Sequence, residues 1–224
     1  MLSNRLIETD LRKRASPACS AAHGRRQASP MTLLRKLSFY IQVLCLALIF
    51  SAASAAERKK WETLLDCQYV AKALNDGDSF RVKCSSGEFV LRLYYVDAPE
   101  VSVRGNAERV REQSDYFGVT STDITEAGLK ARDAVRVILK KPFVVQTRWA
   151  VAGGRSAESR YYAMVEIEGR QLVEILVGEG LARTKGRSIN LPTGEKSSEY
   201  LQKLRALETD AKKNRKGIWA QSTP

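Results

Sequence analysis

Histidine is nearly absent from this chain of 224 residues, and the only one, His23, lies close to the N-terminus. Beyond it, no histidine is available as a metal ligand, nucleophile or general base, which excludes Ser-His-Asp catalysis and other histidine-dependent chemistry. The sequence also lacks zinc-type Cys/His spacing, a Gly-Lys phosphate loop, a dinucleotide fingerprint and internal repeats.

Long apolar runs are limited to one, at residues 37–50, with only Ser38 and Gln42 interrupting it. A basic stretch, residues 31–36, precedes the run and the small-x-small triplet 53–55 follows it, which is the layout of a secretory signal peptide. A membrane-spanning helix is the alternative, but the run is too short to cross about 30 Å of hydrocarbon. We predict a secreted or periplasmic protein whose mature chain is not stably inserted in a membrane.

The predicted signal peptide, called the leader together with the residues before it, determines the domain organisation that we expect. Signal peptides normally begin a chain, so we predict that Met31 is the true start and that the residues before it are a non-native extension or disordered. The expected segments are an extension at 1–30, a signal peptide at 31–55, a linker at 56–66, one domain at 67–220 and a tail at 221–224. Without its first 55 residues the chain keeps 29 Lys/Arg and 23 Asp/Glu, a net charge of +6 that favours polyanions.

Cysteine is scarce as well, because Cys19 and Cys45 fall in the leader and only Cys67 and Cys84 remain. We expect these two near the ends of two paired strands, where a disulfide is geometrically reasonable in an oxidising compartment. Two buried free thiols are the alternative, since cysteine is often a small core residue.

The most informative stretch is the turn at residues 75–79, followed by residues 92–100 with the sequence RLYYVDAPE. Residues 68–74, 79–84 and 88–96 are rich in strand-forming residues and are separated by turn chemistry, which predicts an antiparallel meander. The first turn and the end of the third strand then lie at the same rim of the sheet. Carboxylates from both segments are therefore expected to be neighbours.

Two neighbouring carboxylates, Asp78 and Asp97, repel each other unless a cation or a proton lies between them. Calcium suits such a site, because it accepts oxygen ligands in flexible geometry, and Pro99 keeps Ala98 extended so that its carbonyl can face the same ion. The alternative for Asp76 and Asp78 is a role in the turn alone, since Asp-Gly is a common hairpin sequence.

Together these residues resemble the staphylococcal nuclease-like (thermonuclease) domain family. The resemblance rests on Asp76-Gly77-Asp78, on Arg92, on the segment 96–100 and on Arg160 ahead of a later strand, and it extends from about Cys67 to Trp219. It implies an α+β fold, a five-stranded OB-type barrel with three helices. The implied activity is calcium-dependent endonuclease cleavage of DNA, RNA or both by a monomer.

The resemblance also implies roles for individual residues. Asp78, Asp97 and the Ala98 carbonyl would bind calcium, and Asp76 would act through water. Glu100 would orient or deprotonate the attacking water, while Arg92 and Arg160 would hold the phosphate. On a flat strand Arg92 lies about 16 Å from Asp97, so a solvent-facing Arg92 is the alternative; Arg155 competes for the role of Arg160.

Departures from the family pattern affect substrate binding. Where the family usually offers a stacking tyrosine, this chain has Arg183, Lys185 and Arg187, which we expect to bind the substrate instead. A non-catalytic OB-type module that binds nucleic acid or another polyanion is the alternative function.

Helices are expected in three places. Asp123 with Glu126 suggests a capping box at the start of a helix over 123–140, and the other two are expected over 171–179 and 195–214. The polar residues 101–122 are expected to form a long loop beside the cleft.

Overall fold

The structure is a computed structural model that describes residues 60–153 and 158–222. The predicted extension and signal peptide lie outside the described residues, as does Arg155. The strands are β1 Glu62–Val70, β2 Ser79–Cys84, β3 Gly87–Leu93, β4 Val96–Asp97, β5 Phe143–Ala152, β6 Arg160–Ile167, β7 Arg170–Gln171 and β8 Arg183–Thr184. The helices are α2 Ala107–Phe117, α3 Ser121–Ile138, α4 Leu172–Gly178, α5 Ser197–Lys213 and the 3-10 helix η1 Gly217–Ala220.

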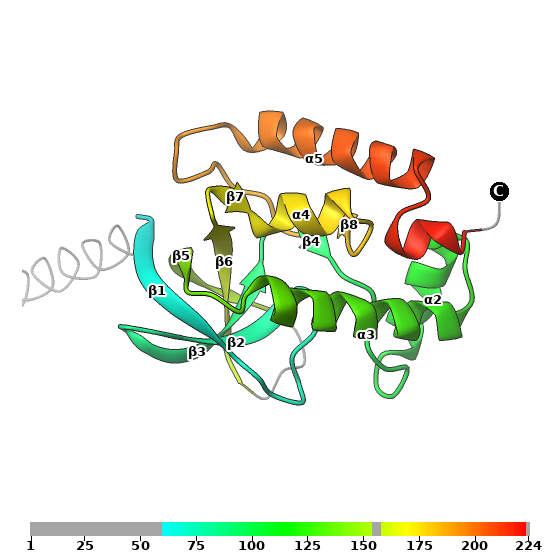
Figure 1. The fold of residues 1–224 in the computed structure, drawn as a ribbon, viewed down its shortest axis with the longest axis horizontal. Coiled ribbons are helices and arrows are strands. Elements are labelled where there is room, and N and C mark those ends of the chain that lie inside the picture. The colour runs from blue at the N-terminus through cyan, green and yellow to red at the C-terminus, as the bar shows by residue number, and fades with distance from the viewer. Residues whose placement is uncertain (1–59, 154–157, 223–224) are drawn as a thin grey trace, which may run out of the picture. The chain divides into compact units, whose positions relative to one another are not determined.

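Five strands form a closed barrel (Figure 1). They pair in the order β3-β2-β1-β5-β6, and a parallel pairing of β3 with β6 closes the ring. Along β3, Phe89, Leu91 and Leu93 are buried, whereas the alternate residues Val90 and Arg92 are less buried, as the two-residue period of a strand requires. The predicted α+β fold with a five-stranded OB-type barrel is confirmed.

The first strand differs from the prediction because it begins earlier and ends earlier. β1 starts at Glu62, so the segment 56–66, expected as a linker, already contains barrel strand. Its pairing with β5 shifts register between Leu64 and Cys67, and Asp66 has a positive φ of 54°. Such a bulge interrupts the alternation of apolar residues, which hides the strand from a search for period two.

A helix lies where a long loop was expected, so the prediction for residues 101–122 was wrong. The described residues contain four α-helices, and α2 is the one that the prediction missed. Val110, Gln113 and Phe117 form its buried face with spacings of three and four residues. That face has only two apolar residues in an otherwise polar segment, and tertiary packing against α3 and Trp219 supplies what periodicity alone does not.

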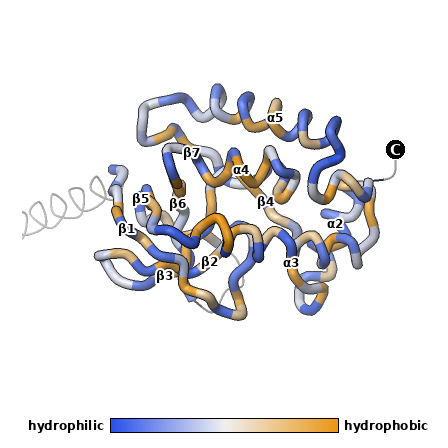
Figure 2. The backbone as a smooth tube through the Cα atoms, in the orientation of Figure 1, coloured by the Kyte–Doolittle hydropathy of each residue, from blue (hydrophilic) through white to orange (hydrophobic). Residues whose placement is uncertain are grey.

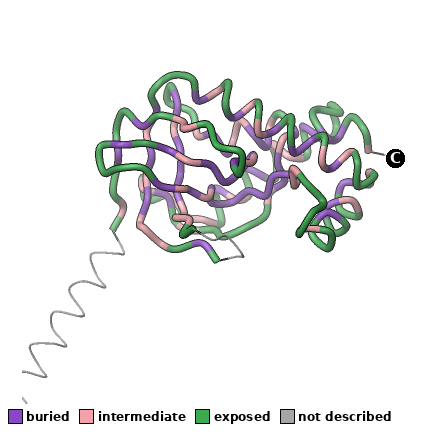
Figure 3. The backbone as a smooth tube through the Cα atoms, turned by 90° about the horizontal axis from the view of Figure 1, so that it is seen from below, coloured by how far each residue is buried: buried purple, intermediate pink, exposed green. Residues whose placement is uncertain are grey.

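The other helices lie close to their predicted positions. Hydrophobic and hydrophilic residues alternate along α3 and α5 (Figure 2). The capping box at the start of α3 is formed by Thr120 and Asp123 instead of Asp123 and Glu126, because Asp123 accepts from the Thr120 backbone N–H at 2.9 Å. Buried and exposed segments alternate along these helices, as expected for elements that cover a core on one side (Figure 3). Within the described part of the chain, none of the helices has the length and apolar character needed to cross a membrane.

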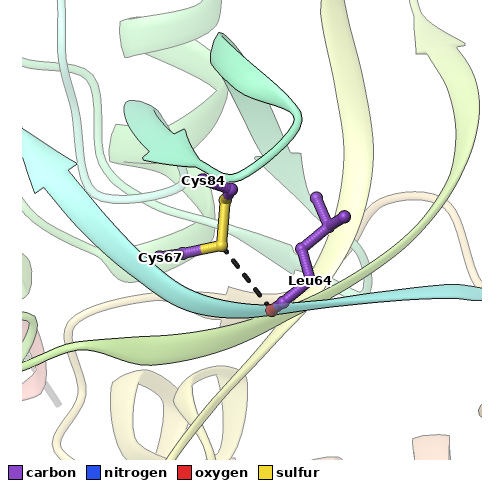
Figure 4. Close-up of a disulfide and its surroundings, with 3 residues drawn as sticks. All are labelled: Leu64, Cys67 and Cys84. Carbon is purple, nitrogen blue, oxygen red and sulfur yellow. Dashed lines mark hydrogen bonds between the residues drawn. A yellow bond between two sulfur atoms is a disulfide. The ribbon is translucent and has the colours of Figure 1, made fainter.

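One end of the barrel is joined covalently. Cys67 in β1 and Cys84 in β2 form a disulfide, and both side chains are buried (Figure 4). At the other end, the glycine of the β1–β2 turn lies against α3: a Cβ added to Gly77 would lie 2.9 Å from the Cβ of Ala131. Gly128 of the same helix approaches Glu100 as closely, so α3 holds both segments of the predicted site.

Candidate active site

The turn between β1 and β2 is organised by Asp76. Its carboxylate accepts hydrogen bonds from the backbone N–H groups of Asp78, at 3.0 Å, and Ser79. Burial and the neighbouring Asp78 carboxylate raise the pKa of Asp76 well above its usual value. Asp76 thus shapes the turn, in line with the turn role considered from the sequence. The Asp78 carboxylate instead faces the backbone N–H of Ala98.

Asp78 and Asp97 are neighbours. The Asp78 carboxylate accepts from the Ala98 backbone N–H at 2.8 Å, and Arg92 forms ion pairs with Asp78 at 2.6 Å and with Asp97 at 3.2 Å. Arg92 and Asp97 lie much closer together than on a flat strand, because the chain turns between β3 and β4, where Tyr95 has a φ of 69°. Arg92 therefore faces the acids and not the solvent.

Ser79 brings the two predicted phosphate-binding arginines together. Arg92 and Arg160 each donate to its hydroxyl at 3.4 Å, and the hydroxyl donates to Asp78 at 3.2 Å. Arg160 is also fixed by the Gly153 carbonyl at 2.9 Å, while its Nε has no partner among the described residues. Two guanidinium groups thus converge on one point beside the carboxylates.

Asp97 is surrounded by cations. Arg183 binds one carboxylate oxygen through Nη2 at 2.7 Å and Nε at 2.9 Å, and Gln113 donates to the same oxygen at 3.2 Å. Arg92 and Arg109 bind the other oxygen. Burial raises the pKa of Asp97, but Arg109, Arg183 and Arg92 outweigh burial and hold the pKa below its usual value.

Glu100 lies beside this cluster and is paired with Arg109 at 2.5 Å. Its backbone N–H donates to Gln113 at 2.9 Å, and Gln113 in turn donates to the Ala98 carbonyl at 2.9 Å. Burial raises the pKa of Glu100, Arg109 opposes this, and the net change is a rise. The sequence interpretation missed Arg109 and Gln113 as site residues, because they lie on a helix that it did not predict.

The three cations expected to bind substrate have different surroundings. Arg183 is 1% exposed and binds both Asp97 and Glu112, because β8 pairs with β4 and sets Arg183 opposite Asp97. Lys185 is exposed and pairs with Glu112 at 2.9 Å. Arg187 is exposed, with its guanidinium 5.6 Å from the ring centre of Tyr162. Only Arg187 combines exposure with a position away from acidic partners.

Comparison with known families decides the classification. The sequence model of the family described as staphylococcal nuclease homologue matches residues 90–221, more than half of the chain. The chain belongs to this family. A search of curated proteins finds no match. Family membership makes the chain a nuclease-like or nucleic-acid-binding domain of OB type; the match includes Arg92, Asp97, Glu100 and Arg160 and begins after the turn with Asp78.

Members of the family typically depend on calcium, and the donor atoms here suit such an ion. The Asp78 and Asp97 carboxylates and the Ala98 carbonyl are oxygen ligands of the kind that calcium prefers. Within residues 60–153 and 158–222, however, no three acidic, histidine or cysteine side chains are arranged to hold a metal ion. Each candidate oxygen atom already has a nitrogen partner, and Arg109, 45% exposed, is the most accessible of the paired cations. The donor atoms are of the kind that calcium prefers, but Arg92, Arg109 and Arg183 are paired with the carboxylates in this structure.

Proposed function

We propose that this protein is an exported nuclease that hydrolyses phosphodiester bonds of DNA, RNA or both in a calcium-dependent reaction. The observation that carries the proposal is the convergence of Arg92 and Arg160 on Ser79, beside the carboxylates of Asp78 and Asp97. Two guanidinium groups at one point suit a phosphate, because each offers several donors in a fixed plane.

The chain's own residues divide the chemistry among them. Arg92 and Arg160 bind the scissile phosphate and offset the negative charge that grows in the transition state. Glu100 accepts the proton of the attacking water, and its raised pKa makes it a better base than an ordinary carboxylate. Calcium, when bound, polarises the phosphoryl oxygen.

For this chemistry, Arg109 has to release Asp97 and Glu100. It pairs with both Asp97 and Glu100, so it occupies one proposed calcium ligand and the proposed base at once. A phosphate arriving at the cleft offers Arg109 another anionic partner, and its half-exposed position leaves room for that exchange. In the proposal, Arg109 leaves the acids when cation and substrate bind.

The same ion pairs favour a second candidate, a non-catalytic module that binds nucleic acid. Three arginines already neutralise Asp97, and Glu100 is engaged by Arg109. A domain that keeps these pairs when nucleic acid is bound has neither a free base nor a cation site, and binds polyanions through its net positive charge.

Cleavage of plasmid DNA and of RNA distinguishes the two candidates. The nuclease cleaves with calcium, stops when a chelator is added, and loses about 100- to 10,000-fold of its rate in Glu100→Gln, the range expected for removal of a general base. Binding without cleavage under all these conditions contradicts the nuclease and supports the module. Export is tested separately by N-terminal sequencing of the secreted protein, where the proposal expects a start near residue 56.

A further inference from the structure

The chain that carries the proposed base leaves its strand before it reaches Glu100. β4 ends at Asp97, and the next three residues pair with no strand in the described part of the chain. Pro99 has no N–H group to donate, and the Ala98 N–H donates to the Asp78 carboxylate at 2.8 Å. The position of Glu100 therefore depends on the partner of its own N–H group.

Gln113 of α2 is that partner. Its Oε1 accepts from the Glu100 N–H at 2.9 Å, and its Nε2 donates to the Ala98 carbonyl at 2.9 Å and to Asp97 Oδ2 at 3.2 Å. The partners determine which way the amide faces, because an N–H group only donates, whereas a carbonyl and a carboxylate only accept. These three hydrogen bonds of one side chain all end on residues 97–100.

A glutamine that serves stability alone is the alternative, and the surroundings of Gln113 argue against it. Val110 and Phe117, the other buried residues of α2, are apolar and belong to a cluster with Trp219. Gln113 is 0% exposed on the same face, where an apolar side chain would pack without the cost of burying an amide. Among the described residues, the amide bonds to the segment 97–100 alone.

Helix α3 confines the same segment by close packing. A Cβ added to Gly128 would lie 2.5 Å from the Glu100 carbonyl oxygen, so the helix backbone lies directly against it. Arg109, one turn before Gln113, also binds Asp97 and Glu100, but it is half-exposed and within reach of water. Gln113 is buried, so it holds the segment while Arg109 exchanges its partners.

We propose that Gln113 is a positioning residue of the nuclease, through which α2 holds the Glu100 carboxylate where it accepts the proton of the attacking water. The side chain does not touch the substrate; it fixes the backbone from which Glu100 projects. A general base has to lie within hydrogen-bond reach of the water, and a misplacement of about 1 Å costs on the order of 100-fold in rate. This inference rests on the proposed function, because it names the residue that aligns the base of the same site.

A double-mutant cycle in the full chain, at saturating calcium, tests the proposal. Gln113→Met keeps the length of the side chain but removes the amide, and it is made both in the parent and in Glu100→Gln. In the parent it should lower kcat by about 10- to 100-fold, the loss expected when a supporting hydrogen bond is removed. KM should not change, because Arg92 and Arg160 still bind the phosphate. In Glu100→Gln, which has no base left to align, the same substitution should cost about twofold or less.

The other outcomes separate positioning from stability and from the proposed function. A loss of folded protein lowers the rate by the same factor in both backgrounds, so equal factors overturn the positioning role and leave the nuclease intact. A raised KM at unchanged kcat does the same. A parent that cleaves neither DNA nor RNA overturns the proposed function and the positioning role together.

A second glutamine provides the matched control. Gln171 donates to Glu166 at 3.3 Å, at the end of β6 opposite Arg160, and Gln171→Met should leave kcat unchanged. A comparable loss of kcat there would mean that any lost amide lowers the rate, which contradicts the proposal. Gln113→Leu repeats the cycle if Gln113→Met does not fold. If neither variant folds, Gln113 serves stability alone and the proposal is wrong.

Discussion

The two ends of strand β2 are held in opposite ways. At its end, Cys84 forms a disulfide with Cys67 among buried apolar side chains. At its start, Ser79 follows a buried carboxylate, Asp78, in a cluster of acids and arginines. The disulfide end is made from residues 17 apart in the sequence, whereas the acidic end gathers charges from β3, β4, β6, β8 and α2.

The comparison separates the end of the barrel that is held by a covalent bond from the end where we propose the chemistry. A disulfide stabilises regardless of what binds, and apolar contacts around it have no reason to change. Buried ion pairs contribute little net stability, because removing charges from water costs about as much as their attraction returns. This agrees with the binding role that we propose for the charges at the acidic end, and substitutions at the two ends should have different consequences.

The largest effect on stability is expected from Arg183→Met. The substitution keeps an apolar stem but removes the guanidinium group, so Glu112 and one carboxylate oxygen of Asp97 lose their buried partner. Loss of one member of a buried ion pair costs about 3 to 5 kcal/mol, which chemical denaturation measures directly. Lys185→Met is the control, since Lys185 also pairs with Glu112 but is exposed, and its loss should cost less than about 1 kcal/mol. Equal effects of the two would show that burial of Arg183 is unimportant.

Next in size is the loss of the disulfide in the double variant Cys67→Ala, Cys84→Ala. Closing a loop of this length stabilises by about 3 kcal/mol through the entropy of the unfolded chain. Unfolding with and without a reducing agent measures this: the parent should lose the same amount on reduction, and the variant should not respond. Cleavage or binding of nucleic acid by the folded fraction should stay unchanged. A lower activity at equal folding would contradict the separation of the two ends.

A smaller effect, on binding instead of stability, is expected from Arg109→Gln. In the proposal the parent moves a positive charge away from Asp97 before calcium binds, and a half-exposed charge that water screens is worth on the order of 1 kcal/mol. Titration calorimetry should therefore show calcium binding about tenfold tighter in the variant. Arg111→Gln, an exposed arginine on the same helix, should bind calcium as the parent does. If Arg109→Gln binds calcium no more tightly than the parent, Arg109 does not compete with the ion.

The sequence by itself determined the meander, the family and the neighbouring acids. Turns at Asp76-Gly77 and Ser86-Gly87 set the direction of three strands, so Asp78 and Asp97 had to meet at one rim. Local patterns of this kind are visible in sequence because strand alternation and turn chemistry act over a few residues. The same logic predicted α3, α4 and α5 to within a few residues.

Only the tertiary structure decided what faces those acids. Arg183 reaches Asp97 because two-residue strands β4 and β8 pair across 86 positions of sequence, and Arg109 reaches it because a mostly polar helix packs on α3. The turn at Tyr95 brings Arg92 back to Asp97, which a flat strand would have kept apart. Such contacts depend on chain segments that are distant in sequence, and no local pattern encodes them. Strand and turn chemistry thus placed the carboxylates, and long-range packing chose their partners.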